Sequence, residues 1–133
     1  FVLFVYDGFI VLIFVFHNVL PTLMSKDLLF ARTSLERYIL PAYFVESNSL
    51  NNGVAPLMIL HTGFDGTKEE MYFMFGLAAI ERGYHLLLLD GPGQGESLLN
   101  NLYYRFDWEK VITPVVDFAL TLACVDKDKC LYC

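Results

Sequence analysis

Two glycine-rich turns, each directly after a short apolar run, carry the residues whose types and spacing could do chemistry. The first turn covers residues 61–66 and the second covers residues 90–97. A glycine-bearing turn between a buried strand and a helix can point backbone N–H groups at an anion, as in the oxyanion hole of an acyl-transfer enzyme. The first turn could equally be a tight bend that needs positive φ at Gly63 and Gly66, and the pattern alone does not separate these interpretations.

The second turn lacks the complete pattern of a nucleotide site or of a catalytic serine. The dinucleotide fingerprint G-x-G-x-x-G requires a glycine where Glu96 stands, and the turn contains no Walker lysine. The nucleophile pattern G-x-S-x-G, centred on Ser97, requires a glycine where Leu99 stands. We therefore expect no cofactor and no nucleophile here, and a small nucleotide-binding module is an alternative that depends on this turn alone.

The elements that position these turns follow from the hydrophobic pattern. Residues 57–61 and 84–89 are continuously apolar, which is typical of parallel strands covered on both faces. Between them we expect a helix, which Thr67 and Glu70 begin as a capping box and Gly83 ends. Its many apolar residues predict that this helix is well buried. The order of elements indicates an α/β sheet, in which ligands bind at the carboxyl ends of the strands.

Before the first turn we expect an edge strand. Residues 38–46 are aromatic and β-branched, and Pro41 places them at an edge because proline cannot donate a hydrogen bond to a ladder. Residues 25–37 have the spacing of a short amphipathic helix. We accordingly divide the chain into a hydrophobic, helical segment at 1–37 and an α/β domain at 38–133.

After the second turn we expect one more helix and one more strand. Asp107 can cap a helix that runs to about residue 123, residues 126–129 have the composition of a solvated turn, and residues 130–133 open a parallel strand. Cys130 and Cys133 match C-x-x-C, but strand residues three apart point to opposite faces and cannot clamp one metal ion. We therefore expect no metal site, and reduced cysteines of the kind found inside cells.

The charge and hydropathy of the chain narrow the classes of partner. The net charge is −6 with no basic cluster, which argues against nucleic acid as a partner. Residues 1–20 are rich in large apolar side chains but include Asp7 and His17. They could be a membrane anchor, a buried element of a larger protein, or sequence upstream of a start at Met24. We expect a cytoplasmic protein, with membrane association through residues 1–20 as the alternative.

Six segments together resemble one family, the α/β hydrolases that include 2,6-dihydroxypseudooxynicotine hydrolase, the fermentation-respiration-switch esterase-like proteins and fungal polyketide-shortening hydrolases of pigment pathways. The resemblance covers about residues 38–132. Its motifs agree in order and spacing, and they are residues 40–44, residues 56–66 with Thr67, Glu69, Glu70 and Tyr72, and residues 81–84, 90–95, 106–111 and 113–117.

The resemblance implies a three-layer α/β-hydrolase fold, truncated before the nucleophile elbow that would follow residues 130–133. It implies a Ser–Asp–His hydrolase that acts on an ester, amide or activated C–C bond of a small molecule without a cofactor, although this sequence contains none of the triad. What carries over is the oxyanion-hole loop, with backbone donors at Gly63 and Phe64 and supporting positions at Asp65 and Glu70. The alternative is a non-catalytic truncated α/β protein, with or without a membrane contact.

Overall fold

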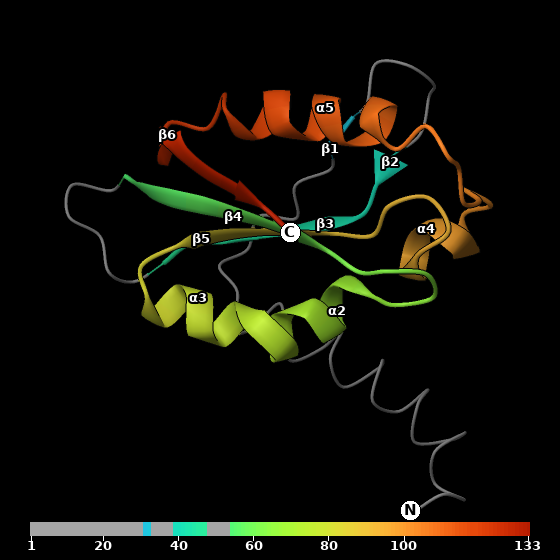
Figure 1. The fold of residues 1–133 in the computed structure, drawn as a ribbon, viewed down its shortest axis with the longest axis horizontal. Coiled ribbons are helices and arrows are strands. Elements are labelled where there is room, and N and C mark those ends of the chain that lie inside the picture. Colours follow the sequence, from blue (N-terminus) through green and yellow to red (C-terminus); the bar gives the residue numbers. More distant parts are fainter. Residues whose placement is uncertain (1–30, 33–38, 48–53) are drawn as a thin grey trace, which may run out of the picture.

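A four-stranded sheet forms the centre of the structure, with helices on both of its faces (Figure 1). The computed structural model describes residues 31–32, 39–47 and 54–133. The spatial order of the strands is β3 (Ala42–Val45), β5 (His85–Leu89), β4 (Ala55–His61) and β6 (Val125–Tyr132). The three-layer α/β architecture that we expected is confirmed.

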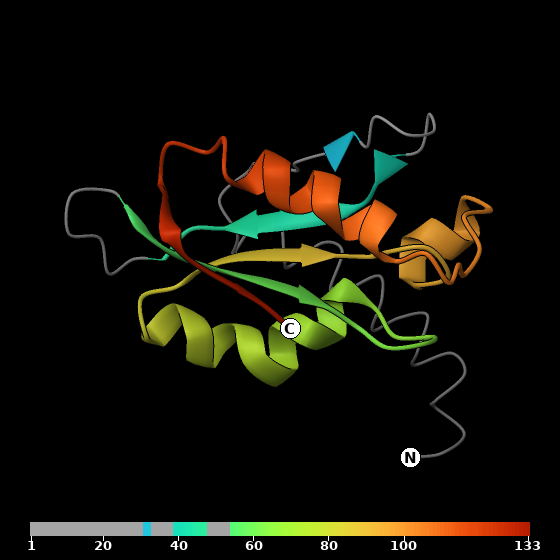
Figure 2. The same ribbon diagram turned by 45° about the horizontal axis from the view of Figure 1, so that its top comes forward.

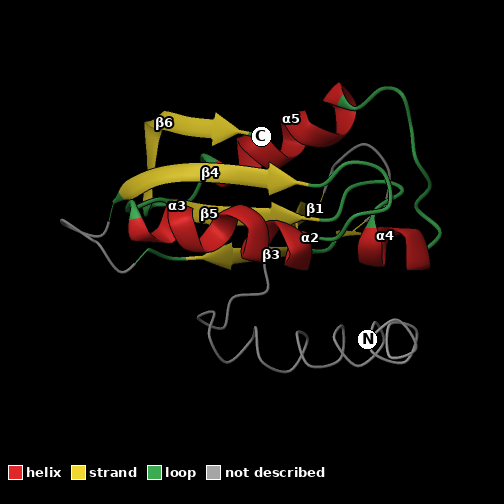
Figure 3. Cartoon of the chain, turned by 60° about the horizontal axis from the view of Figure 1, so that its bottom comes forward, coloured by secondary structure: helices red, strands yellow, loops and turns green. Residues whose placement is uncertain are grey.

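Three of these strands run in the same direction. β4 is parallel to both β5 and β6, whereas β3 is antiparallel to β5 at the sheet edge. Figure 3 shows the arrowheads of β4, β5 and β6 on one side, and the arrowhead of β3 on the other. Because the parallel strands end at the same edge of the sheet, the two glycine-rich turns leave from that edge together.

The sheet is apolar on both faces because each face carries a helical layer. Every residue of β5 is buried, including His85. Leu87 and Leu89 pack into one core cluster with residues of α5 (Glu109–Ala119), while Leu86 and Leu88 pack into the other with Tyr72 and Ala79. Figure 2 shows the sheet between these two layers. The alternation of β5 side chains between the two clusters explains why its sequence is a continuous run of leucine.

One helix in three parts joins β4 to β5: α2 (Lys68–Met71), the π-helical η1 (Tyr72–Gly76) and α3 (Leu77–Glu81). The predicted capping box is confirmed, since the Thr67 hydroxyl accepts from the Glu70 N–H and the Glu70 carboxylate accepts from the Thr67 N–H. Gly83, with φ 86°, follows the last turn and provides the predicted stop.

The prediction that this helix is well buried was wrong. Only the face that carries Tyr72 and Ala79 packs on the sheet. Four large apolar residues on the rest of the helix are 46–66% exposed in the structure, namely Phe73, Met74, Phe75 and Leu77. Composition gives the amount of apolar surface on a helix, but the number of neighbouring layers decides how much of that surface is covered.

Pro41 divides the strand that we predicted at residues 38–46. β2 (Ile39–Leu40) pairs antiparallel with β1 (Ala31–Arg32) in a separate two-stranded sheet, and β3 begins after the proline. The Pro41 carbonyl accepts from the Asp90 N–H at 3.0 Å, so the proline supplies an acceptor where it cannot donate. As predicted, β3 lies at the edge of the main sheet.

The predicted helix at residues 25–37 was wrong at Ala31–Arg32, which form a strand because they pair with β2. The rest of that helix and residues 1–20 lie outside the described residues. In the part of the chain that the structure describes, no helix has the length and apolar character needed to cross a membrane.

Asp107 does not cap α5, which was predicted to begin at this residue. Its carboxylate instead accepts from Arg105 at 2.6 Å and pairs with Lys110 at 3.0 Å, and the cap position, Trp108, makes no side-chain cap bond. The strong cationic donors on both sides of Asp107 compete with the helix N–H groups for its oxygens. α5 itself buries the predicted apolar face through Val111 and Val115.

Residues 126–129, predicted as a solvated turn, belong to β6 but are not paired with β4. Between the pair Ala55–Val125 and the pair Leu57–Cys130, β4 advances by two residues and β6 by five. The Asp126 carboxylate accepts from the Asp128 N–H and from Lys129, which closes the bulge locally. The composition therefore identified the irregularity but not the strand that contains it.

We expect Leu87→Ala to lower the free energy of unfolding by about 2–5 kcal/mol, because it leaves a cavity in the fully buried β5. Leu99→Ala is the matched control, since Leu99 is 82% exposed, and its effect should stay within about 0.5 kcal/mol. Urea denaturation followed by circular dichroism measures both. Equal effects would contradict the assignment of β5 to the core.

Candidate active-site loop

The first turn lies between β4 and α2, with Gly63, Phe64 and Asp65 exposed at its tip. Among the described residues, no backbone carbonyl accepts a hydrogen bond from the N–H of Gly63 or Phe64. Two adjacent N–H groups are thus available to a ligand at the carboxyl end of a parallel strand. A developing oxyanion needs such donors at about 2.7–3.1 Å.

The backbone of this turn differs from the bend that the glycines suggested. Neither Gly63 nor Gly66 is among the positive-φ residues of the described chain, and Asp65 instead has φ 62°. Gly66 is required by close approach, because a Cβ there would lie 2.5 Å from the Cβ of Thr62. At Gly63 a Cβ would meet no atom within 4 Å. The tight-bend explanation for the two glycines, as a need for positive φ, was therefore wrong.

The other predicted site residues lie at different distances from the tip of the turn. Phe64 is 76% exposed and meets the ring of Tyr104 edge-on, with 6.0 Å between centroids. The Glu70 carboxylate is occupied by the N–H of Thr67 at 2.8 Å, so Glu70 acts on the start of α2. The structure therefore places Gly63, Phe64 and Asp65 together at the tip of the turn, and Glu70 in the first turn of α2.

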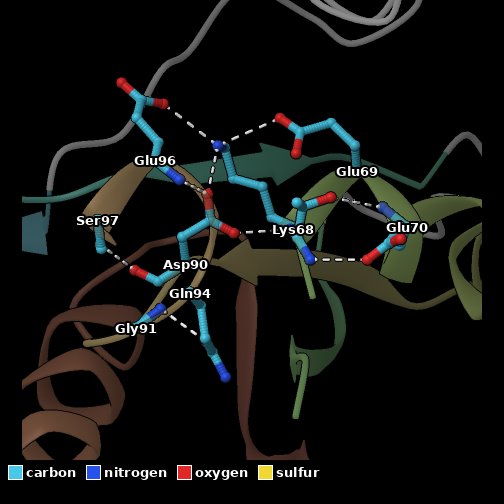
Figure 4. A network of polar contacts seen from close by, with 9 residues as sticks. Lys68, Glu69, Glu70, Asp90, Gly91, Gln94, Glu96 and Ser97 are labelled. Atoms are coloured by element: carbon cyan, nitrogen blue, oxygen red, sulfur yellow. Dashed lines mark hydrogen bonds and ion pairs between the residues drawn. The ribbon is translucent and has the colours of Figure 1, made fainter. Parts of the chain in front are cut away.

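The second turn is anchored by Asp90, the residue that follows β5. Its carboxylate is completely buried and accepts from the Lys68 N–H at 2.7 Å, the Lys68 ammonium at 2.8 Å and the Glu96 N–H at 3.0 Å (Figure 4). Gly95 lies against this carboxylate, because a Cβ on Gly95 would be 2.5 Å from Asp90 Oδ2. One carboxylate thus holds the start of α2 and the start of α4 (Gly95–Leu99).

Lys68 completes this polar cluster with only 2% of its side chain exposed. Besides Asp90, its ammonium pairs with Glu69 and Glu96, each at 3.2 Å, and lies 4.9 Å from the centre of the Tyr43 ring. Sequence reasoning missed this residue. A signal was present, because a lysine in the first turn of a helix opposes the helix dipole and needs a specific anionic partner.

The environment keeps Lys68 charged. Burial by itself lowers the pKa of Lys68, but the carboxylates of Asp90 and Glu69 outweigh burial and hold this pKa above its ordinary value of 10.5. Burial raises the pKa of Asp90, and the charge and hydrogen bonds of Lys68 oppose that rise. Because the two groups neutralise each other and are both buried, the pair braces the two turns and does not face a ligand.

Ser97 has no access to a substrate. It is completely buried, and its hydroxyl donates to the Asp90 carbonyl at 2.6 Å. This placement agrees with the expectation that Ser97 is not a nucleophile, because a nucleophilic hydroxyl must reach the reacting carbonyl.

His61, at the end of β4, belongs to a ring cluster. Its ring lies 5.1 Å from that of Trp108 and 5.2 Å from that of Tyr132, and Trp108 Nε1 donates to the Tyr132 hydroxyl at 2.8 Å. His61 Nδ1 is 2.6 Å from the Thr62 carbonyl oxygen. The imidazole is thus engaged in packing at the base of the first turn.

Neither a metal site nor a catalytic pocket was found elsewhere among the described residues. Among the described residues, no group of three or more histidine, cysteine, aspartate or glutamate side chains could hold a metal ion. An apolar cavity of about 300 Å³ lies between β4 and the helix that follows it, lined mainly by apolar side chains such as Met58, Leu60 and Phe75. Arg82, Tyr84 and Cys133 also line it, but its lining includes no histidine or carboxylate that could serve as a general base.

The chain is similar to several curated fungal proteins. Hydrolase acrC of Aspergillus aculeatus is 51% identical over 63 residues, which are 47% of this chain and 15% of that protein. 20-Hydroxy-prefusarin hydrolase FUS2 of Gibberella moniliformis is 45% identical over 67 residues, which are 50% of this chain and 16% of the length of FUS2. Hydrolyase poxO of Penicillium oxalicum is 32% identical over 100 residues, which are 74% of this chain and 24% of the length of poxO. The chain therefore spans less than a quarter of the length of each of these relatives.

A solved structure of an α/β hydrolase has a similar fold. The crystal structure of 2,6-dihydroxy-pseudo-oxynicotine hydrolase superimposes with a TM-score of 0.59 and 28% sequence identity, over 74% of this chain and 27% of that protein. No protein-family model matches the chain.

We expect Lys68→Met to lower the free energy of unfolding by about 3–5 kcal/mol, because it leaves the Asp90 carboxylate buried without its cation. Lys110→Met is the control, since Lys110 pairs with Asp107 while 56% exposed, and such a pair is worth at most about 1 kcal/mol. Chemical denaturation of the wild type and both variants measures these changes in the free energy of unfolding. If Lys68→Met cost no more than the control, the pair would not be a brace.

The stability that Lys68 provides should depend on pH in the alkaline range. Because its pKa is higher in the folded state than the ordinary 10.5, the unfolded state loses this proton first as the pH rises. The contribution is therefore complete below about pH 10.5 and declines above it. Unfolding free energies measured on both sides of this pH should fall more steeply for the wild type than for Lys68→Met, and parallel curves would contradict the raised pKa.

Proposed function

We propose that this chain, which carries part of an α/β-hydrolase fold and is related to fungal α/β hydrolases, supplies the oxyanion-hole loop of a serine hydrolase. The observation that carries the proposal is the pair of N–H groups of two exposed residues, Gly63 and Phe64, which have no backbone acceptor among the described residues. Acyl-transfer enzymes of this fold draw one oxyanion donor from the loop that follows the corresponding strand.

In this proposal the triad comes from parts of the whole protein outside these 133 residues. The end of β6 supports this arrangement, because the Cys133 carbonyl accepts from the His61 N–H at 3.3 Å and the Cys133 N–H donates to the Ile59 carbonyl at 3.0 Å. A nucleophile elbow that followed β6 would therefore begin beside the first turn. A serine there would face the same side of the sheet edge as the two N–H groups.

The substrate in this proposal is a small organic molecule with an ester, amide or activated C–C bond. The names of two similar proteins support this class, since FUS2 is named for 20-hydroxy-prefusarin and the solved structure for 2,6-dihydroxy-pseudo-oxynicotine. The reaction would pass through a tetrahedral oxyanion, which the two N–H groups stabilise more strongly than the planar carbonyl of the substrate.

We expect Phe64→Pro in the whole protein to lower kcat for an activated ester by about 10²–10³, equivalent to about 2.7–4 kcal/mol, because it removes one oxyanion donor. Phe64→Ala is the matched control, since it removes the ring and keeps the N–H. Its kcat should stay well above that of Phe64→Pro. Steady-state kinetics with a 4-nitrophenyl ester measures both variants.

Two outcomes would contradict the proposal. Equal losses of kcat in Phe64→Ala and Phe64→Pro would mean that the side chain, rather than the N–H, matters. A folded whole protein that neither hydrolyses the ester nor reacts with a fluorophosphonate would instead favour the non-catalytic alternative.

A further inference from the structure

The Gln94 side chain links the two glycine-rich turns at a position that the proposed function does not use. Gln94 is only 4% exposed. Its Oε1 accepts from the Gly91 N–H at 2.8 Å, within the second turn (Figure 4). Its Nε2 donates to the Thr62 carbonyl and, at 3.1 Å, to the Gly63 carbonyl, both in the first turn.

The partners of Gln94 determine which way its amide points. A backbone N–H can only donate, so the side-chain atom that faces Gly91 must be the oxygen. Two carbonyl oxygens can only accept, so the atom that faces Thr62 and Gly63 must be the nitrogen, which has two hydrogens to give. No other side-chain type of similar length offers one acceptor and two donors in this arrangement.

The two carbonyls that Gln94 holds belong to the same peptide groups as the two proposed oxyanion donors. The Thr62 carbonyl shares a planar trans peptide with the N–H of Gly63, and the Gly63 carbonyl shares one with the N–H of Phe64. In a trans peptide the C=O and the N–H point in opposite directions. Fixing both oxygens toward Gln94 therefore turns both N–H groups away from it.

We propose that Gln94 is a positioning residue that aims the N–H groups of Gly63 and Phe64 at the oxyanion. This inference rests on the proposed function. Gln94 touches no substrate, because it is buried behind the turn, and it acts through the two peptide planes. Preorganised donors are effective because they need no reorganisation as charge develops on the oxygen.

Gln94 can do this because its own turn is held in place. The Gly95 N–H donates to the Gly66 carbonyl at 3.2 Å, and the Gly93 N–H donates to the Leu102 carbonyl at 2.8 Å. The Thr62 carbonyl is also within 2.6 Å of His61 Nδ1. The glycine-rich sequence after β5, which is not a nucleotide site, thus has a role as the rigid support for one amide side chain.

The decisive variant is Gln94→Glu, studied in the whole protein. It keeps the shape of the side chain and the acceptor for Gly91, but it replaces the two-hydrogen donor by an oxygen that faces two carbonyl oxygens. We expect kcat for the 4-nitrophenyl ester to fall tenfold or more while KM stays within about twofold, because only a transition-state contact is lost. Binding of a trifluoromethyl ketone, which forms a tetrahedral adduct, should weaken by the same factor as kcat/KM.

A pH profile of kcat, corrected for the folded fraction measured at each pH, separates positioning from a general loss of structure. A protonated glutamate at position 94 can donate to one of the two carbonyls, so the ratio of variant to wild-type kcat should rise as the pH falls. Of the titratable side chains, His61 faces this position, with its Nδ1 at 3.4 Å from Gln94 Nε2. Asp117→Asn, on the exposed face of α5, is the control and should leave kcat unchanged. If kcat and KM of Gln94→Glu matched the wild type, or if kcat fell only in proportion to the folded fraction, the inference would be overturned.

A second readout does not require activity. In ¹⁵N-labelled protein, the amide resonances of Gly63 and Phe64 should shift in Gln94→Glu and stay in place in Asp117→Asn. Unchanged resonances in both variants would overturn the positioning role. If the wild type failed to react with the fluorophosphonate while these resonances shifted, the proposed function would fail and the orientation of the peptides by Gln94 would stand.

Discussion

The buried ion pair between Lys68 and Asp90 is the interaction on which both turns depend. Asp90 follows one strand and Lys68 begins the helix after another, so the pair fixes the distance between two loops that are 22 residues apart in sequence. Burial makes this interaction demanding, because a charge left without its partner in the interior is strongly destabilising. The position of Gly95 over the carboxylate shows how closely the backbone has to approach for the pair to form.

The two turns are held by two different chemical means. Lys68 and Asp90 use charge, which acts on whole segments and sets their separation. Gln94 uses a neutral amide, which is less costly to bury and has directional hydrogen bonds that set the orientation of individual peptide groups. A loop that presents backbone donors needs both, since separation without orientation would leave the N–H groups of Gly63 and Phe64 free to rotate.

What could be predicted from the sequence was local or periodic. The continuous apolar runs predicted β4 and β5, and the capping box and Gly83 predicted both ends of the helix between them. The Lys68–Asp90 and Gln94 contacts were not predicted, because they join residues 22 to 32 positions apart and depend on the parallel register of two strands. The exposure of the helix after β4 was missed because burial depends on neighbouring layers, which composition does not encode.

The burial of β5 has a consequence for the timescale on which the site can move. Its five residues are wholly buried, and it is paired on both sides, with β3 and with β4. Amide protons in such a strand exchange with solvent only when the whole domain opens. The loop that follows Leu102 is much more exposed to solvent, with Phe106 94% exposed. The second turn therefore begins at a strand that is buried and paired on both sides, so the geometry around Asp90 should persist through local motions of the exposed loop that follows Leu102.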